Sequence, residues 1–150
     1  MKLLVLTVLV MLVTSCGVRP TGAIMGGPAP TEELDGAVLY LVNDNVLTRV
    51  VRPKSDQMQN NLQLLAEGPT PEESATGLTT DLPPNMAPIE TSGTPDSLTV
   101  KISAPVATLT EMAMNQLTCT AQQPWQNLNA KITLSGPDQT LSPRTCPFTA

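Results

Sequence analysis

Histidine is absent from this sequence of 150 residues, and the aromatic residues are limited to Tyr40, Trp125 and Phe148. The absence of histidine excludes Ser-His-Asp and Cys-His catalysis, histidine-ligated metal sites and the usual general base near neutral pH. So few aromatic rings also argue against a surface on which nucleic acid bases or sugar rings would stack. We therefore expect no cofactor, no metal site and no enzymatic activity.

Basic residues are scarce as well. Lysine and arginine together number 8 against 13 aspartates and glutamates, which gives a net charge of −5. This balance argues against nucleic acid as a partner and against electrostatic docking on anionic lipid. The 15 prolines indicate tethers and interrupted loops rather than long continuous elements. A chain of this length holds one domain at most once its ends are discounted.

The longest apolar stretch lies at the N-terminus, where residues 1–16 read MKLLVLTVLVMLVTSC. It has the length of a signal peptide and is shorter than the roughly 20 residues that a membrane-spanning helix needs. Residues 13–16 (VTSC) resemble a bacterial lipobox, in which the cysteine accepts diacylglycerol and becomes the new N-terminus. We predict a signal peptide at 1–15 and acyl chains on Cys16 that anchor the protein to the extracytoplasmic face of the cell membrane. The alternative is an ordinary secretory signal followed by a chance cysteine.

Residues 16–35 are rich in glycine, proline, threonine and alanine and show no hydrophobic periodicity. This composition predicts a flexible tether between the lipidated cysteine and a folded domain. We place the domain at 36–136 and a C-terminal tail at 137–150.

The domain alternates strand-like and helix-like patterns. Apolar runs and alternation predict strands, and capping residues with apolar stripes predict helices. The expected strands are 37–42, 46–51, 87–91, 98–103 and 130–135, and the expected helices are one from Ser55 or Asp56 to Glu67, a short one after Thr70, and one opened by a Thr108–Glu111 capping box. This order predicts an α+β fold, a small mixed or antiparallel sheet with two main helices packed on one face.

The stretch GPTPEE (68–73) is the clearest local signal. Gly68 stands just past the last apolar position of a helix, where positive φ is needed, and Pro69 prevents continuation. Thr70 is a good N-cap, Pro71 suits the first helical position, and Glu73 completes a capping box with Thr70. One helix is therefore expected to end here and a second to begin.

Two cysteines, Cys119 and Cys146, remain once Cys16 is lipidated. In an exported protein, two such thiols are expected to form a disulfide, which would attach the tail to the last helix. Chain entropy suggests that closing a loop of 146 − 119 = 27 residues stabilises the fold by roughly 3–4 kcal/mol. A metal or redox pair is the alternative, but the CxxC spacing and a histidine are both missing.

The residue pattern resembles the GerMN domain of sporulation, germination and actinobacterial envelope proteins. The matching stretches are VLYLV (38–42), VVRP (50–53), LLAEGPTPEE (64–73), GLTTDLPP (77–84), SLTVKIS (97–103) and QLTCT (116–120). The resemblance implies a small α+β domain, similar to the ring-building domains of envelope machines. It implies no enzymatic activity and no catalytic residues.

These observations predict a non-enzymatic lipoprotein whose domain binds an envelope protein or the cell wall. One alternative is a structural subunit that self-assembles through an open sheet edge near 87–91. Another is a binder of small molecules or peptidoglycan fragments, or an enzyme that uses the carboxylates of Glu72, Glu73 and Asp81. The interface is predicted in two proline-containing loops, whose residues are Gly68, Pro69, Thr70, Pro71, Leu82, Pro83 and Pro84. The sequence does not indicate an oligomeric state.

Overall fold

The computed structural model of the chain describes residues 36–53, 60–123 and 129–147. Its elements, in chain order, are β1 (Gly36–Asn43), β2 (Val46–Pro53), α2 (Asn61–Ala66), α3 (Pro71–Ala75), β3 (Glu90–Thr94), β4 (Ser97–Lys101), a 3-10 turn (Val106–Thr108), α4 (Glu111–Gln122) and β5 (Lys131–Ser135). The predicted signal peptide, Cys16 and the tether lie outside the described residues, as do Ser55, Asp56 and Trp125.

Strands β1 and β2 form an antiparallel hairpin whose register runs from Asn43↔Val46 to Gly36↔Pro53. The connecting residues Asp44 and Asn45 have φ angles of 47° and 64°. Two consecutive left-handed residues define the tight turn that matches the twist of a hairpin, and Asp and Asn adopt this conformation more easily than other side chains. The strands expected at 37–42 and 46–51 therefore pair with each other through a two-residue turn.

The second sheet has the order β3-β4-β5. β3 and β4 are antiparallel, and Thr94 pairs with Ser97 across the turn Pro95-Asp96. β4 and β5 are parallel, and α4 lies in the connection between them. The C-terminal tail continues along β5, with isolated bridges Ile132↔Arg144 and Ser135↔Thr140.

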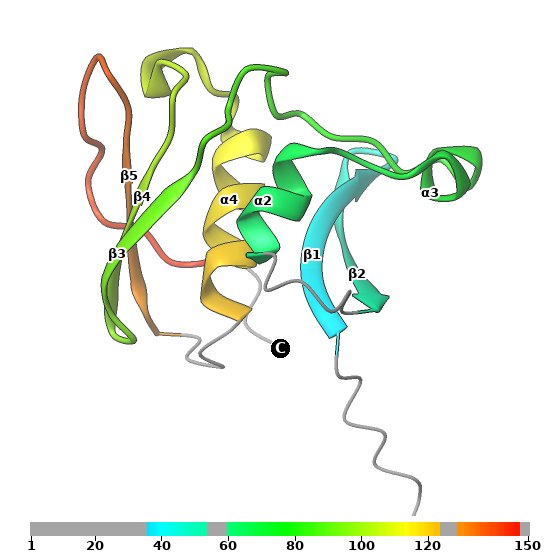
Figure 1. Cartoon of the computed structure of the whole chain (residues 1–150), viewed down its shortest axis with the longest axis horizontal. Coiled ribbons are helices and arrows are strands. Elements are labelled where there is room, and N and C mark those ends of the chain that lie inside the picture. The colour runs from blue at the N-terminus through cyan, green and yellow to red at the C-terminus, as the bar shows by residue number, and fades with distance from the viewer. Residues whose placement is uncertain (1–35, 54–59, 124–128, 148–150) are drawn as a thin grey trace, which may run out of the picture. The chain divides into compact units, whose positions relative to one another are not determined.

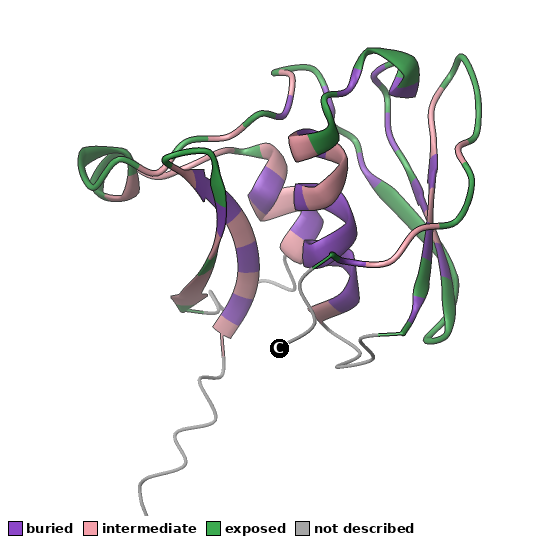
Figure 2. Cartoon of the chain, turned by 180° about the vertical axis from the view of Figure 1, so that it is seen from behind, coloured by how far each residue is buried: buried purple, intermediate pink, exposed green. Residues whose placement is uncertain are grey.

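The helices α2 and α4 lie between the hairpin and the three-stranded sheet (Figure 1). Their apolar side chains join those of both sheets in one core. The largest fully buried apolar residues of this core are Leu39, Leu41, Leu62, Leu65, Met86, Val100, Val106, Leu117, Ile132 and Leu134. Figure 2 shows from behind that buried positions lie on the helices and at alternating residues along much of β1.

Helix α4 is buried at every residue from Gln116 to Gln122. Its polar side chains are therefore hydrogen-bonded, as burial requires. The Gln116 Nε2 atom donates to Tyr40 O at 2.9 Å, and its Oε1 atom accepts from Asp81 N at 2.9 Å. Gln122 donates to Ala130 O at 2.7 Å and accepts from Cys146 N at 3.3 Å. The helix thus holds the main chain of segments on both of its sides.

The α+β class is confirmed, but the strands form two sheets where we expected one. The edge of β1 that does not pair with β2 explains the separation, because a helix side chain and a loop occupy it and no described strand of the other sheet pairs there. Tyr40 N donates to the Thr120 hydroxyl at 3.1 Å, and Val42 exchanges hydrogen bonds with Thr79. The helices consequently pack between two sheets rather than on one face of a single sheet.

Two helix starts differ from the expectation. α2 begins at Asn61, because Asn60 is extended (φ −67°, ψ 135°) and its side chain accepts from Leu62 N. α4 is capped by Thr110, whose side chain accepts from Ala113 N, so the Thr108–Glu111 capping box is wrong. Thr108 belongs to the preceding 3-10 turn, where its hydroxyl donates to Pro105 O at 2.8 Å. A competing local hydrogen bond of this kind is a common alternative for threonine.

The weak strand expected at 87–91 forms instead at Glu90–Thr94. The two-residue turn at Pro95-Asp96 sets the register and pairs Glu90 with Lys101. The Pro88 carbonyl accepts from the Ser103 hydroxyl at 3.3 Å. Proline has no N–H for a ladder, so the strand begins only after it.

Candidate interaction surface

The turn between α2 and α3 forms as the sequence predicts. Gly68 has a φ of +79°, a conformation that glycine adopts without steric cost. Thr70 caps α3 by accepting from Glu73 N at 3.2 Å, and Glu73 Oε2 accepts from Thr70 N at 2.8 Å. The capping box is therefore complete, with Pro71 in the first turn.

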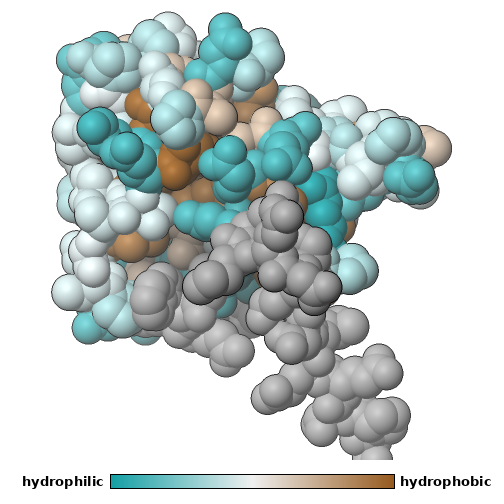
Figure 3. Space-filling model, viewed as in Figure 1, coloured by the Kyte–Doolittle hydropathy of each residue, from teal (hydrophilic) through white to brown (hydrophobic). Residues whose placement is uncertain are grey.

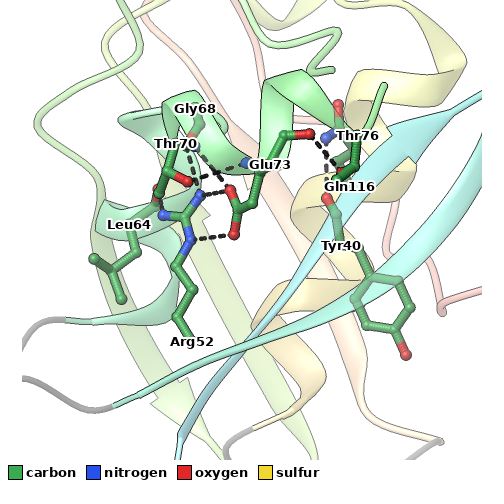
Figure 4. A network of polar contacts seen from close by, with 8 residues as sticks. All are labelled: Tyr40, Arg52, Leu64, Gly68, Thr70, Glu73, Thr76 and Gln116. Atoms are coloured by element: carbon green, nitrogen blue, oxygen red, sulfur yellow. Dashed lines mark hydrogen bonds and ion pairs between the residues drawn. The ribbon is translucent and has the colours of Figure 1, made fainter. Parts of the chain in front are cut away.

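Arg52, near the end of β2, clamps this turn from the side (Figure 4). Its Nε and Nη2 atoms donate to the two carboxylate oxygens of Glu73 at 2.9 and 2.6 Å. It also donates to Gly68 O at 2.7 Å and to Leu64 O at 3.2 Å. The Arg52 and Glu73 side chains are 12% and 14% exposed, so water screens this bidentate pair only in part. The clamp fixes both the end of α2 and the start of α3.

The carboxylates of α3 are held in their ionised form. Hydrogen bonding from the Arg52 guanidinium lowers the pKa of Glu73 below its ordinary value. The pKa of Glu72 is also lowered, by backbone hydrogen bonding and by the Thr70 hydroxyl. A general acid needs a pKa raised toward the working pH. These two groups are therefore poorly suited to acid catalysis, and Asp81 accepts from the Thr110 hydroxyl at 2.9 Å instead of lying with them.

We call residues 68–78 the α3 arm. α3 contributes no buried residue, and Figure 1 shows it projecting beyond the hairpin at one end of the domain. The arm returns to the body where Val42 N and Thr79 O are 2.9 Å apart. Figure 3 shows that the apolar surface on this side gathers over the middle of the domain, whereas the end that carries α3 is mostly hydrophilic. α3 is thus largely exposed and polar, and the arm that carries it is fixed at both ends.

The predicted interface residues have different environments. Gly68, Pro69 and Thr70 are half-buried at the base of the arm, and Pro71 is exposed. Leu82 is only 8% exposed and belongs to the core, so it does not line a surface. Pro83 is half-buried and Pro84 is exposed. The apolar side chain of Leu82 anchors the second loop to the core instead of presenting it.

The role of Arg52 was not predicted from the sequence. Its partner Glu73 is 21 residues away along the chain. The sequence pattern around Glu73 indicates only its place in the capping box. The role of Gln116 was likewise not predicted, because its partners Tyr40 and Asp81 lie far along the chain. A single arginine after a strand, or one glutamine in an apolar helix, carries no signal about which segment it contacts.

Cys119 and Cys146 form a disulfide with a Cα–Cα distance of 4.7 Å, and their accessible surface is 0% and 6% of the maximum. With Leu47 they make a small buried cluster, against which Tyr40 and Met112 pack. The bond joins the middle of α4 to the tail beside β5. Both predicted partners are therefore placed together by the fold.

Within the described ranges, no group of three or more His, Cys, Asp or Glu residues is arranged to hold a metal ion. The part of the chain that the structure describes also has no helix long and apolar enough to cross a membrane.

The architecture defines a small α+β domain with two helices between a hairpin and a mixed sheet. It is GerMN-like, since it resembles the structure of the tandem GerMN domains of the sporulation protein GerM from Bacillus subtilis, with a TM-score of 0.57 and 12% identity. The match covers 81% of this chain and 49% of that one, so this chain spans about half the length of the tandem structure. At this identity the likeness shows the fold alone. No family model and no curated protein matches the sequence.

Proposed function

We propose that this protein is a non-enzymatic lipoprotein, anchored through Cys16 to the extracytoplasmic face of the cell membrane, whose GerMN-like domain binds an envelope protein or the cell wall. The lipobox at 13–16 and the tether at 16–35 support the anchor. A tethered domain near its partner gains effective concentration without new contacts. The net charge of −5 argues against nucleic acid as the partner.

The observation that carries the binding role is the α3 arm. Its base is fixed by the Arg52–Glu73 pair and the capping box, yet α3 itself buries no side chain. A segment that is ordered without contributing to the core is preorganised for contact with a partner, because little conformational entropy remains to be lost on binding. Glu72, Ser74, Ala75 and Thr76 are the positions of the arm that would make this contact.

A catalytic role receives less support. Glu73 is engaged by Arg52, Glu72 has a lowered pKa on an exposed first turn, and the whole sequence has no histidine. The lowered pKa values of Glu72 and Glu73 favour their ionised states. The domain is therefore better suited to binding than to proton transfer.

The anchor is tested by the intact mass of the protein extracted from membranes. We expect a mass that matches cleavage before Cys16 plus acyl chains, and Cys16→Ala should remain unacylated. An unmodified wild-type mass with cleavage elsewhere would replace the anchor with a free secreted domain.

The arm is tested by photo-crosslinking in intact cells, with a photoreactive amino acid placed at Glu72 or Ser74 of the full chain. The control position is Ala107, which is exposed on the 3-10 turn Val106–Thr108. We expect one defined crosslinked species from the arm, lost on Glu72→Lys when the probe is at 74. Equal crosslinking from position 107 would contradict the assignment.

A further inference from the structure

Each of the two sheets has one outer edge that other segments of the chain close with hydrogen bonds. On the outer edge of β1, the Asn61 side chain donates to Val38 O at 3.2 Å. Thr120 and Gln116 bind the N–H and C=O of Tyr40, and Thr79 binds both main-chain groups of Val42. On the outer edge of β5, the tail forms the bridges Ile132↔Arg144 and Ser135↔Thr140. These edges therefore offer no unpaired row of main-chain groups.

Among the described residues, no hydrogen bond reaches the outer main-chain groups of β2. Because Tyr40 and Val42 direct their main-chain groups away from the hairpin, their partners Arg49 and Leu47 do the same. Val51, opposite Val38, continues the row. Alternate residues of an antiparallel strand direct their N–H and C=O groups to the same side, so Leu47, Arg49 and Val51 present donors and acceptors outward. Such a row is a template for another strand.

The edge of β3 is a weaker template. Ile102 N donates to Ser135 O. The even-numbered β4 residues Leu98 and Val100 therefore direct their main-chain N–H and C=O groups toward β5, and the odd-numbered residues direct theirs toward β3. On β3, the partners of Val100 and Leu98 are Thr91 and Gly93, whose main-chain groups therefore point away from the sheet. Gly93 has a φ of +126°, which departs from a regular strand. All five residues of β3 (ETSGT) are exposed and none has a large apolar side chain, so the strand offers a partner no apolar contact.

The charge on β2 indicates what kind of strand fits. Arg49 is exposed, and within the described part of the chain it has no ion pair, whereas Arg52 is paired with Glu73. β2 contains no acidic residue. Val46, at its start, is 56% exposed, an unusually large value for an apolar side chain of this domain. A cross-strand carboxylate opposite Arg49 is favourable, and a like charge is not.

These features argue against a second copy pairing symmetrically through β2. Antiparallel pairing centred on Arg49 would place two guanidinium groups directly opposite each other. The chain is also acidic as a whole, with a net charge of −5. A strand of different sequence avoids the central repulsion.

We propose that β2 accepts an extended strand of a partner protein, which pairs with Leu47, Arg49 and Val51 and carries a carboxylate opposite Arg49 with an apolar residue near Val46. This inference rests on the proposed binding role and names its mode as addition of a strand to a sheet. The hairpin then becomes a three-stranded sheet, with main-chain hydrogen bonds giving affinity and Arg49 selecting the partner.

The test is amide hydrogen exchange of the full chain by NMR, with two synthetic peptides as probes. Both alternate valine and threonine, and they differ only in a central glutamate or lysine. We expect the amides of Leu47, Arg49 and Val51 to exchange rapidly in the free protein and to slow at least about tenfold when the glutamate peptide saturates β2. The glutamate peptide should bind about three- to fivefold more tightly than the lysine peptide, as expected for one cross-strand ion pair.

Two variants make the assignment specific. Val51→Pro removes an outward N–H without removing a hydrogen bond to β1, so the hairpin remains and peptide binding is lost. Thr91→Pro makes the same change on the edge of β3 and should leave binding intact. Arg49→Glu should reverse the preference between the two peptides. Protection of the Leu39 and Leu41 amides checks that each variant is folded.

Three outcomes would overturn the proposal: no binding by either peptide, binding that leaves the three amides unprotected, or equal loss of binding in both proline variants. Protection of these amides in the free protein that rises with concentration would assign the edge to a second copy instead. If the peptides fail while the α3 arm still crosslinks to a partner, only the strand-addition mode falls. If both fail, the binding role itself falls.

Discussion

Arg52 shows how one side chain can organise a segment that the core does not hold. Its guanidinium donates to the carboxylate of Glu73 and to the main-chain carbonyls of Leu64 and Gly68. The planar fork of arginine matches a carboxylate with two parallel hydrogen bonds, which lysine cannot do. The base of the α3 arm therefore depends on the identity of this residue and not only on its charge.

We predict that Arg52→Ala lowers the free energy of unfolding by about 2 kcal/mol, because it leaves a largely buried carboxylate and two carbonyls without their donor. Arg52→Lys should recover less than half of this loss. Arg49→Ala, at an exposed position earlier on the same strand, should stay within about 0.5 kcal/mol of wild type. Urea unfolding of the three variants measures the difference. Similar values for the two alanine variants would show that the clamp contributes no stability.

The lowered pKa of Glu73 makes the stability of the domain depend on pH. A carboxyl whose pKa is lower in the folded state stabilises the fold fully above its unfolded value, which is ordinarily 4.5. That contribution is lost as the pH falls through the folded pKa. We expect wild type to lose on the order of 1 kcal/mol more than Glu73→Gln between pH 7 and pH 3. Unfolding at a series of pH values measures this, and parallel curves for the two proteins would contradict it.

Helix α4 holds neighbouring segments in place through side-chain hydrogen bonds, as Arg52 does for a single turn. Its apolar residues Ala113, Leu117 and Ala121 belong to the main core. Its buried side chains Gln116, Thr120 and Gln122 bind main-chain groups of neighbouring segments. Closing the edge of β1 with helix side chains separates the two sheets. A buried polar group of this kind is stabilising only while its partners are in place.

We predict that Gln116→Met destabilises the fold by about 2–3 kcal/mol, although methionine fills a similar volume, because Tyr40 O and Asp81 N lose their partner. The half-buried neighbour Asn115 provides a control, and Asn115→Ala should cost less than about 1 kcal/mol. Chemical unfolding compares the two. If Gln116→Met costs no more stability than Asn115→Ala, the hydrogen bonds of Gln116 contribute little and filling its volume is sufficient.

The domain as a unit depends on how the tail is attached. The Cys119–Cys146 disulfide closes a loop of 27 residues, and the tail beside it covers the outer edge of β5. Arg144 binds the Met114 sulfur at 2.9 Å and pairs with Glu111. The bond therefore connects α4 to the tail that covers the outer edge of β5.

We expect the double variant Cys119→Ala/Cys146→Ala to lose about 3–4 kcal/mol of stability, mostly because the unfolded chain regains its freedom. The amides of Ile132 and Arg144, which pair with each other, should then exchange faster than those of β1. Hydrogen exchange measures both changes. For wild type, thiol titration of the unfolded, unreduced protein should find no free Cys119 or Cys146, and two reactive thiols would exclude the bond.

The sequence by itself determined what depends on neighbouring residues. The hairpin turn at Asp44-Asn45, the end of α2 at Gly68 and the capping box of Thr70 and Glu73 follow from local backbone preferences and short-range hydrogen bonds. The strand positions and the α+β class followed from hydrophobic periodicity, to within a few residues. The absence of histidine limits the chemistry of this chain whatever fold it adopts.

Only the tertiary structure decided which distant groups meet. It paired Arg52 with Glu73, placed Gln116 between Tyr40 and Asp81, buried Leu82 and divided the strands into two sheets. Among the described residues, it also showed that the outer edge of β2 has no hydrogen-bond partner, because the closure of an edge depends on groups from other elements. Hydrogen bonds between segments leave no periodic trace in the sequence, since any donor can satisfy any acceptor that the fold brings within reach.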